Sequence, residues 1–144
     1  MKKEIILKRG REESLRRFHP WVFSGAIVRI DGDVAEGDIV RVVSSAGETI
    51  GFGHYQVGSI AVRMLSFGGE APGKNFWTDR LTAALKLREA AGVVSVHNTA
   101  YRLIHGEGDN LPGLIVDIYG DCAVMQAHSA GMFLAGKEIA EKMM

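Results

Sequence analysis

The stretch from Tyr101 to Asp121 constrains the fold more than any other part of this 144-residue chain. Two apolar-rich runs, one ending at Ile104 and the other covering Leu114 to Tyr119, flank a segment dense in glycine, asparagine and proline. Such residues permit positive φ or fix φ, so they favour turns. The pattern predicts a β-hairpin with a long, structured loop rather than a two-residue turn.

The same loop begins like a dinucleotide-binding fingerprint, with Gly106 and Gly108 two positions apart. The third glycine of that fingerprint would stand at Leu111. The fingerprint also needs a helix after the loop, so that the helix N-terminus faces the phosphates, whereas a strand pattern follows here. The hairpin interpretation is therefore favoured over a nucleotide site.

Composition excludes several classes of protein. The formal net charge is zero, so there is no global basic signal for nucleic acid, although residues 1–17 hold seven basic against three acidic side chains. Cys122 is the only cysteine, which rules out an internal disulfide and fits a reducing cytoplasm. The apolar run near the N-terminus is too short for a signal peptide, and no stretch approaches a membrane span. We expect a soluble cytoplasmic protein without a membrane partner.

The first 67 or so residues predict a small β-rich unit. Strands are expected at residues 4–8, 26–30, 39–43, 48–56 and 59–67. A short helix over 11–17 should end by Pro20, because the residue before a proline is pushed out of the helical region. Residues 19–25 are expected to form a compact aromatic turn. Short strands joined by glycine-rich turns favour a small barrel.

A second unit follows a linker-like break at residues 68–73, which places domains at 1–70 and 74–144. Asn75 or Thr78 can cap a helix over residues 76–91, and Gly92 suits its C-terminal end. On this helix three cationic side chains are expected to face solvent: Arg80, Lys86 and Arg88. After the hairpin come a third strand at 122–129 and a helix from residue 131, which makes this unit α+β.

The hairpin closely resembles a segment of roughly RLV-x-x-E-x-D-x-LPGL-x-VD-x-YGD in S-adenosylmethionine-dependent ribosomal RNA large-subunit methyltransferases that modify cytosine at carbon 5. The matching positions are Arg102, Glu107, Asp109, Leu111, Pro112, Gly113, Leu114, Val116, Asp117, Tyr119, Gly120 and Asp121. Ile118 departs from the pattern, because many members carry arginine there.

The first unit resembles the PUA domain, a pseudo-barrel RNA-binding module at the start of the same family. Residues 7–10 (LKRG) and 19–27 (HPWVFSGAI) carry this resemblance. It implies a mixed α/β chain in which a PUA-like pseudo-barrel is followed by an α+β bridging domain. The chain then resembles roughly the first third of a family member, and the catalytic domain that binds S-adenosylmethionine is absent from it.

RNA binding needs cations for phosphates and flat groups for unstacked bases. The first domain offers such groups close together, and we predict that they contact RNA: Lys8, Arg9, Arg11, Arg16, Arg17, His19 and Trp21. The alternative is that the cations coat a solvated helix. Trp21 and Phe23 by themselves are expected in the core, and a helix-capping role for His19 is as well supported as a ligand role.

No catalytic residue, metal site or cofactor site is predicted within the chain. Its histidines are scattered and it has one cysteine, which argues against zinc. His105, Glu107 and Asp109 alternate and could hold a cation, but exposed loop carboxylates are far commoner. Cys122 lies in an apolar strand, and a buried strand cysteine behaves as a small hydrophobe. The resemblance places the family's thiolate nucleophile in the missing domain.

The sequence thus predicts the RNA-binding portion of a ribosomal RNA methyltransferase, inactive alone, with ribosomal RNA as its partner. The implied parent reaction is methyl transfer from S-adenosylmethionine to carbon 5 of a cytosine extruded from its stack. Two alternatives stay open. One is a non-catalytic scaffold or dimerisation module, favoured by the near-zero net charge and compatible with a homodimer. The other is a stand-alone RNA-binding accessory protein.

Overall fold

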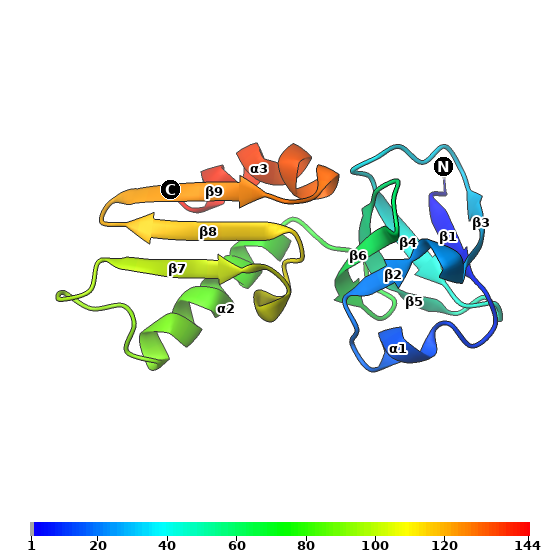
Figure 1. Cartoon of the computed structure of the whole chain (residues 1–144), viewed down its shortest axis with the longest axis horizontal. Helices are drawn as coiled ribbons and strands as arrows, with labels where there is room; N and C mark the ends of the chain where they lie inside the picture. Colours follow the sequence, from blue (N-terminus) through cyan, green and yellow to red (C-terminus); the bar gives the residue numbers. More distant parts are fainter. Residues whose placement is uncertain (1) are drawn as a thin grey trace. The chain divides into compact units, whose positions relative to one another are not determined.

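The computed structural model describes residues 2–144, which form two compact units divided between Pro72 and Gly73 (Figure 1). The first unit holds a six-stranded sheet, and the second holds a three-stranded sheet with two helices. The predicted mixed α/β class is therefore confirmed. Among the described residues, no helix combines the length and apolar character that crossing a membrane requires.

The first unit is built on strands in the order β2-β6-β5-β4-β1-β3. Its elements are β1 (Glu4–Leu7), α1 (Glu13–Arg16), β2 (Trp21–Phe23), the 3-10 turn η1 (Ser24–Ala26), β3 (Ile27–Asp31), β4 (Ile39–Val43), β5 (Thr49–Tyr55) and β6 (Ile60–Phe67). All neighbours are antiparallel except β1 and β4. The five predicted strands and the short helix are confirmed to within two residues. The predicted aromatic turn is wrong in part, because Trp21–Phe23 pairs with β6 as an edge strand.

The six-stranded sheet curls around an apolar core. Val40 and Val42 of β4 alternate inward and are fully buried. They lie opposite Gly53 and Gly51 of β5, where a Cβ atom would run into backbone oxygens of β6. Only glycine fits at these two positions, and the missing side chains let β5 and β6 approach closely on the concave face. The sheet bends there into the half-barrel seen in Figure 1.

Helix α1 ends earlier than its proline requires. It stops at Arg16, and Phe18 takes the left-handed conformation with φ of 66°. The backbone N–H of His19 then donates to the carbonyl of Ser14 at 3.0 Å, which satisfies one helix-end acceptor. The chain therefore turns at Phe18, two residues before Pro20, and enters β2 from there.

The second unit contains the predicted hairpin. Its elements are α2 (Phe76–Ala90), β7 (Ala100–His105), the 3-10 turn η2 (Gly106–Asp109), β8 (Leu114–Tyr119), β9 (Cys122–Ala127) and α3 (Ala130–Lys142). The antiparallel sheet has the order β7-β8-β9. Leu114 and Val116 point inward and are fully buried. Helix α2 contacts β7, α3 contacts β9, and the helices contact each other, so both cover the same face of the sheet.

The helix ends of this unit follow the predicted chemistry in part. Gly92 has φ of 75° and donates to the carbonyl of Glu89 at 3.0 Å, which confirms the C-terminal end of α2. Asn75 occupies the N-cap position, but its side chain makes no capping bond. The hydroxyl of Ser129 accepts from the backbone N–H of Met132 and caps α3.

Candidate nucleic-acid interface

The predicted cations of the first unit lie in and around α1, and all are exposed. Lys8 follows β1, and its backbone N–H donates to the carbonyl of Ala26 at 2.8 Å, which fixes the start of the connection. Among residues 2–144, Lys8, Arg9, Arg11 and Arg17 form no ion pair. Four positive charges are therefore available to a polyanion along one short segment.

Arg16 differs from these four, because it pairs with Glu48 in the loop between β4 and β5. Both side chains are more than half exposed. An exposed pair of this kind contributes at most about 1 kcal/mol, so a phosphate can replace the carboxylate at small cost.

An aromatic cluster lies on edge strand β2. The ring centroids of His19, Trp21 and Phe23 are 6.0 to 6.1 Å apart. Because Val22 is the inward residue of β2, alternation directs Trp21 and Phe23 to the other face. Trp21 is half-buried and Phe23 is 48% exposed, so the expectation that Phe23 belongs to the core is wrong.

Sequence reasoning missed two residues beside this cluster. Phe18 is 72% exposed, and its ring meets Phe67 edge-on at 5.3 Å. Arg63 of β6 lies directly opposite Trp21 in the antiparallel ladder, so both side chains emerge on the same face. Phe18 could have been found from the sequence, since it adjoins the cation-rich segment. Arg63 could not, because its position depends on strand pairing.

His19 organises the entry into β2 without capping the helix through its ring. Its Nδ1 accepts from the backbone N–H of Trp21 at 3.1 Å, which ties the ring to the start of β2. The Nε1–H of Trp21 is shielded and has no partner among the described residues. A buried donor without a partner costs free energy, and this marks the Trp21 edge as incompletely satisfied.

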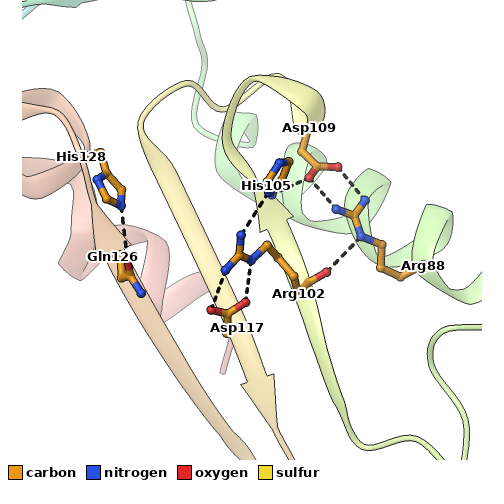
Figure 2. Close-up of polar contacts among 7 residues, drawn as sticks. All are labelled: Arg88, Arg102, His105, Asp109, Asp117, Gln126 and His128. Carbon is orange, nitrogen blue, oxygen red and sulfur yellow. Dashed lines mark hydrogen bonds and ion pairs between the residues drawn. The ribbon is translucent and has the colours of Figure 1, made fainter.

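The hairpin loop of the second unit is held by an ion pair rather than open to a cation. Arg88 of α2 donates two hydrogen bonds to the Asp109 carboxylate, both at 2.7 Å (Figure 2). The side chains are 15% and 4% exposed, and Asp109 also accepts from the backbone N–H of His105 at 2.6 Å. The expectation that Arg88 faces solvent is therefore wrong. Within residues 2–144, no cluster of three or more His, Cys, Asp or Glu could hold a metal ion.

The helix-free face of this sheet carries a second, more exposed pair. Arg102 bonds Asp117 at 2.8 Å and approaches Nδ1 of His105 at 3.3 Å (Figure 2). The hydrogen bond from Arg102 lowers the pKa of Asp117, and the same bond raises the pKa of the guanidinium.

Cys122 is exposed at the start of β9, so its expected burial is wrong. Exposure follows because β9 is an edge strand.

Comparison with known families defines the class of the first unit. Residues 5–67 match the family model of the PUA-like domain. The match covers β1 to β6, and therefore the whole curled sheet with α1 and the aromatic cluster. The first unit is a PUA-like domain, as the resemblance implied.

The chain as a whole is homologous to ribosomal RNA large-subunit methyltransferases. It is 39% identical over 133 residues to Ribosomal RNA large subunit methyltransferase I of Escherichia coli strain SMS-3-5, and 41% identical over 133 residues to the protein of that name from Alteromonas mediterranea. Each match covers 91% of this chain and 33% of the relative. The chain thus spans about one third of the length of these relatives.

Solved structures agree at the level of fold. A candidate SAM-dependent methyltransferase from Streptococcus mutans matches with a TM-score of 0.80 at 18% identity, over 99% of this chain and 37% of that one. A second structure, of a candidate methyltransferase complexed with SAH, matches with the same score and coverage.

Proposed function

We propose that this chain is the RNA-binding portion of a SAM-dependent ribosomal RNA methyltransferase and that ribosomal RNA is its partner. The observation that carries the proposal is the combination, within a PUA-like domain, of unpaired cations around α1 with the half-buried Trp21 and the exposed Phe23 on β2. The homology to ribosomal RNA methyltransferases over 91% of the chain supports the same conclusion.

The two kinds of side chain divide the work of binding. Lys8, Arg9, Arg11 and Arg17 contact phosphates, and Arg16 joins them when it releases Glu48. Phe18, Trp21 and Phe23 offer ring faces and edges for unstacked bases, which suits single-stranded or looped RNA. His19 fixes the backbone of this edge through its bond to Trp21.

The parent reaction that we propose is methyl transfer from SAM to carbon 5 of a cytosine in large-subunit ribosomal RNA. The family pattern in the hairpin supports this choice. We place neither the nucleophile nor SAM in this chain, because the single thiol, Cys122, follows Asp121 rather than a cation that would stabilise a thiolate. Methyl transfer to ribosomal RNA by the purified chain would contradict this part of the proposal.

The test is binding of the chain to a fluorescent, structured fragment of large-subunit ribosomal RNA between 50 and 200 mM salt (roughly the range over which phosphate contacts are resolved). Each phosphate contact to single-stranded RNA contributes about 0.7 to the slope of log K against log salt. The double variants Lys8→Ala/Arg9→Ala and Arg16→Ala/Arg17→Ala should each reduce that slope by roughly 1.4. A control, Lys74→Ala/Lys86→Ala, removes two exposed cations of the second unit and should leave it unchanged.

Substitutions of aromatic residues in the same binding experiment distinguish contacts to bases from simple charge attraction. Phe23→Ala should weaken binding by about 1–3 kcal/mol without changing the salt slope, because stacking is lost and no charge is removed. Tyr119→Ala, an exposed aromatic of the second unit, is the matched control. Equal affinity of all variants and wild type, or no binding at low salt, would refute the assignment of this surface.

A further inference from the structure

The outer face of the first unit's sheet, opposite the apolar core, carries a row of side chains that spans three neighbouring strands. Glu4 of β1 lies opposite Arg41 of β4, and Arg41 lies opposite Phe52 of β5. Val42, the next residue of β4, points into the core, so alternation directs Arg41 and its two neighbours to the outer face. None of these residues belongs to the set of RNA contacts proposed around α1.

The guanidinium of Arg41 is supported on one side and open on the other. Its Cζ atom lies 5.5 Å from the centroid of the Phe52 ring, over the ring face. The side chain of Arg41 is 46% exposed, whereas Phe52 is buried. Nε approaches the Glu4 carboxylate only to 3.9 Å, which is beyond hydrogen-bond distance, so this contact leaves the guanidinium donors available. A planar cation held in this way can stack on a nucleobase.

A pocket of about 500 Å³ opens beside this guanidinium. Its lining combines the apolar side chains of Ile39, Phe52 and Ala71 with the charged side chains of Glu4 and Arg41. Small-ligand sites in proteins have volumes of this order, and they join apolar walls to a few polar groups. An apolar pocket with a stacking cation in its wall suits a nucleobase.

A second and more polar pocket, of about 320 Å³, lies next to the first. The two share the lining residues Lys2, Glu4 and Arg41, so they are neighbours on one face. The second pocket adds Arg29 and the hydroxyl group of Ser45. Its lining thus holds three cations against one carboxylate. An excess of cations together with a hydroxyl donor favours a phosphate group.

The cations of the polar pocket have donors available. Lys2 is exposed and forms no ion pair within residues 2–144. Arg29 bonds Asp31 through its Nε at 3.1 Å, and this contact does not use the two terminal nitrogens. Exposed pairs of this kind are weak, so Asp31 does not prevent Arg29 from binding a phosphate. Lys3 is different, because its ammonium is bound to Asp38 at 2.7 Å.

We propose that the two neighbouring pockets bind one ribonucleotide. The base enters the apolar pocket and stacks on the open side of Arg41, and Lys2 and Arg29 hold the phosphate in the polar pocket. Glu4 lines both pockets, so its carboxylate lies where the ribose passes and accepts from a ribose hydroxyl. The ligand is a free nucleoside monophosphate or one nucleotide of an RNA strand, since both present these groups. The site does not depend on the RNA contacts around α1.

The test is a nuclear magnetic resonance titration of the 144-residue chain with adenosine monophosphate. The resonances of Arg41 Nε–H and of Ile39 should shift, with a dissociation constant of roughly 1 mM or tighter. Arg41→Lys keeps the charge and removes the planar group, so it should weaken binding at least about fivefold. Arg102→Lys makes the same change at an exposed, ion-paired arginine of the second unit and should leave binding unchanged.

A second variant tests the phosphate contact. Lys2→Ala should weaken the binding of adenosine monophosphate but not that of adenosine, because only a contact to the phosphate is lost. Lys137→Ala, at an exposed position of α3, is the matched control and should change neither.

The trinucleotide ApApA distinguishes the two sources of the ligand. Tighter binding than adenosine monophosphate, measured at Arg41, would indicate an RNA strand, and weaker binding would indicate a free nucleotide. The proposal is overturned if the Arg41 resonance does not shift at about 10 mM adenosine monophosphate, tenfold above the expected dissociation constant. Equal affinity of the wild type and Arg41→Lys would overturn it as well. Neither result bears on the contacts around α1, because none of those residues takes part in this test.

Discussion

At the scale of single residues, His54 is a titratable group buried within the first unit. It lies on β5 between Ile39 of β4 and Arg63 of β6, and only 3% of its surface is exposed. Burial lowers the pKa of its imidazole from 6.5 to about 4, because the charged form loses its hydration. His54 is therefore neutral in the folded protein at neutral pH.

This shift predicts an acid-sensitive first domain. The unfolded state binds the His54 proton more tightly, so the stabilisation is fully present above pH 6.5 and is lost as pH falls toward 4. Between pH 7 and 5.5 the free energy of unfolding should fall by roughly 1 kcal/mol from this group. The measurement is the exchange free energy of β5 amides, corrected for intrinsic rates, at the two pH values.

The control for this prediction uses paired substitutions. His54→Gln should remove that part of the pH dependence whatever its effect on absolute stability. His97→Gln, at an exposed position, should keep it. If the two variants show the same pH dependence, His54 is not the titrating group.

The cations around α1 are exposed, as their residue type favours, because charged side chains seldom lose water without a partner. The same reasoning misplaced Phe23 and Cys122, since their exposure comes from lying on edge strands, which depends on strand order. Arg88 was misplaced for a related reason. Its partner Asp109 lies 21 residues away, and local pattern carries no information about that pairing.

At the scale of elements, the hairpin itself was predictable from the sequence, but the contact that holds its loop to α2 was not. Period-two alternation and turn residues specify β7, η2 and β8 locally. The link from α2 to η2, through Arg88 and Asp109, is a tertiary feature that holds the loop against the helix (Figure 2). The strand β2 was not predicted, because three residues are too few to show the alternation of buried and exposed side chains that marks a strand.

The link between α2 and η2 should dominate the stability of the second unit. Arg88→Leu leaves the Asp109 carboxylate buried without its partner, which should cost about 3–5 kcal/mol. Arg102→Leu, which breaks the exposed pair with Asp117, should cost at most about 1 kcal/mol. Urea unfolding in a Trp21→Phe background measures this, because Trp77 of α2 then reports the second unit alone.

A double variant distinguishes the charge from the packing. Arg88→Leu/Asp109→Asn keeps an acceptor for the His105 backbone N–H and removes the buried charge. It should recover part of the lost stability relative to Arg88→Leu. No recovery would mean that packing of the Arg88 side chain, and not the uncompensated carboxylate, accounts for the loss.

At the scale of the whole molecule, each unit has its own sheet and its own buried residues. The first is centred on side chains such as Ile5, Val42 and Val62, and the second on Ile104, Leu114 and Met132. The segment between them, with exposed Glu70 and Gly73, contributes little to either core. The predicted boundary between residues 70 and 74 remains a prediction about folding, which can be tested directly.

Glutamate-specific proteolysis under native conditions should cut first after Glu70. Exposed glycine-rich connections are preferred sites of nicking, whereas glutamates in helices resist it. Mass spectrometry should find pieces of residues 1–70 and 71–144, and each should retain a cooperative thermal transition. An initial cut after Glu36 or Glu89, or pieces without such transitions, would contradict independent folding.

The parallel pairing of β1 with β4 has a consequence for the order of synthesis. β1 lies inside the sheet, between β3 and β4, although it precedes both of these strands in the chain. Its partner β4 ends at Val43, so most of the first unit must be synthesised before β1 can pair with both of its neighbouring strands. Ile5 and Leu7, which are fully buried in the folded unit, stay partly exposed until then, and transiently exposed apolar surface of this kind favours aggregation.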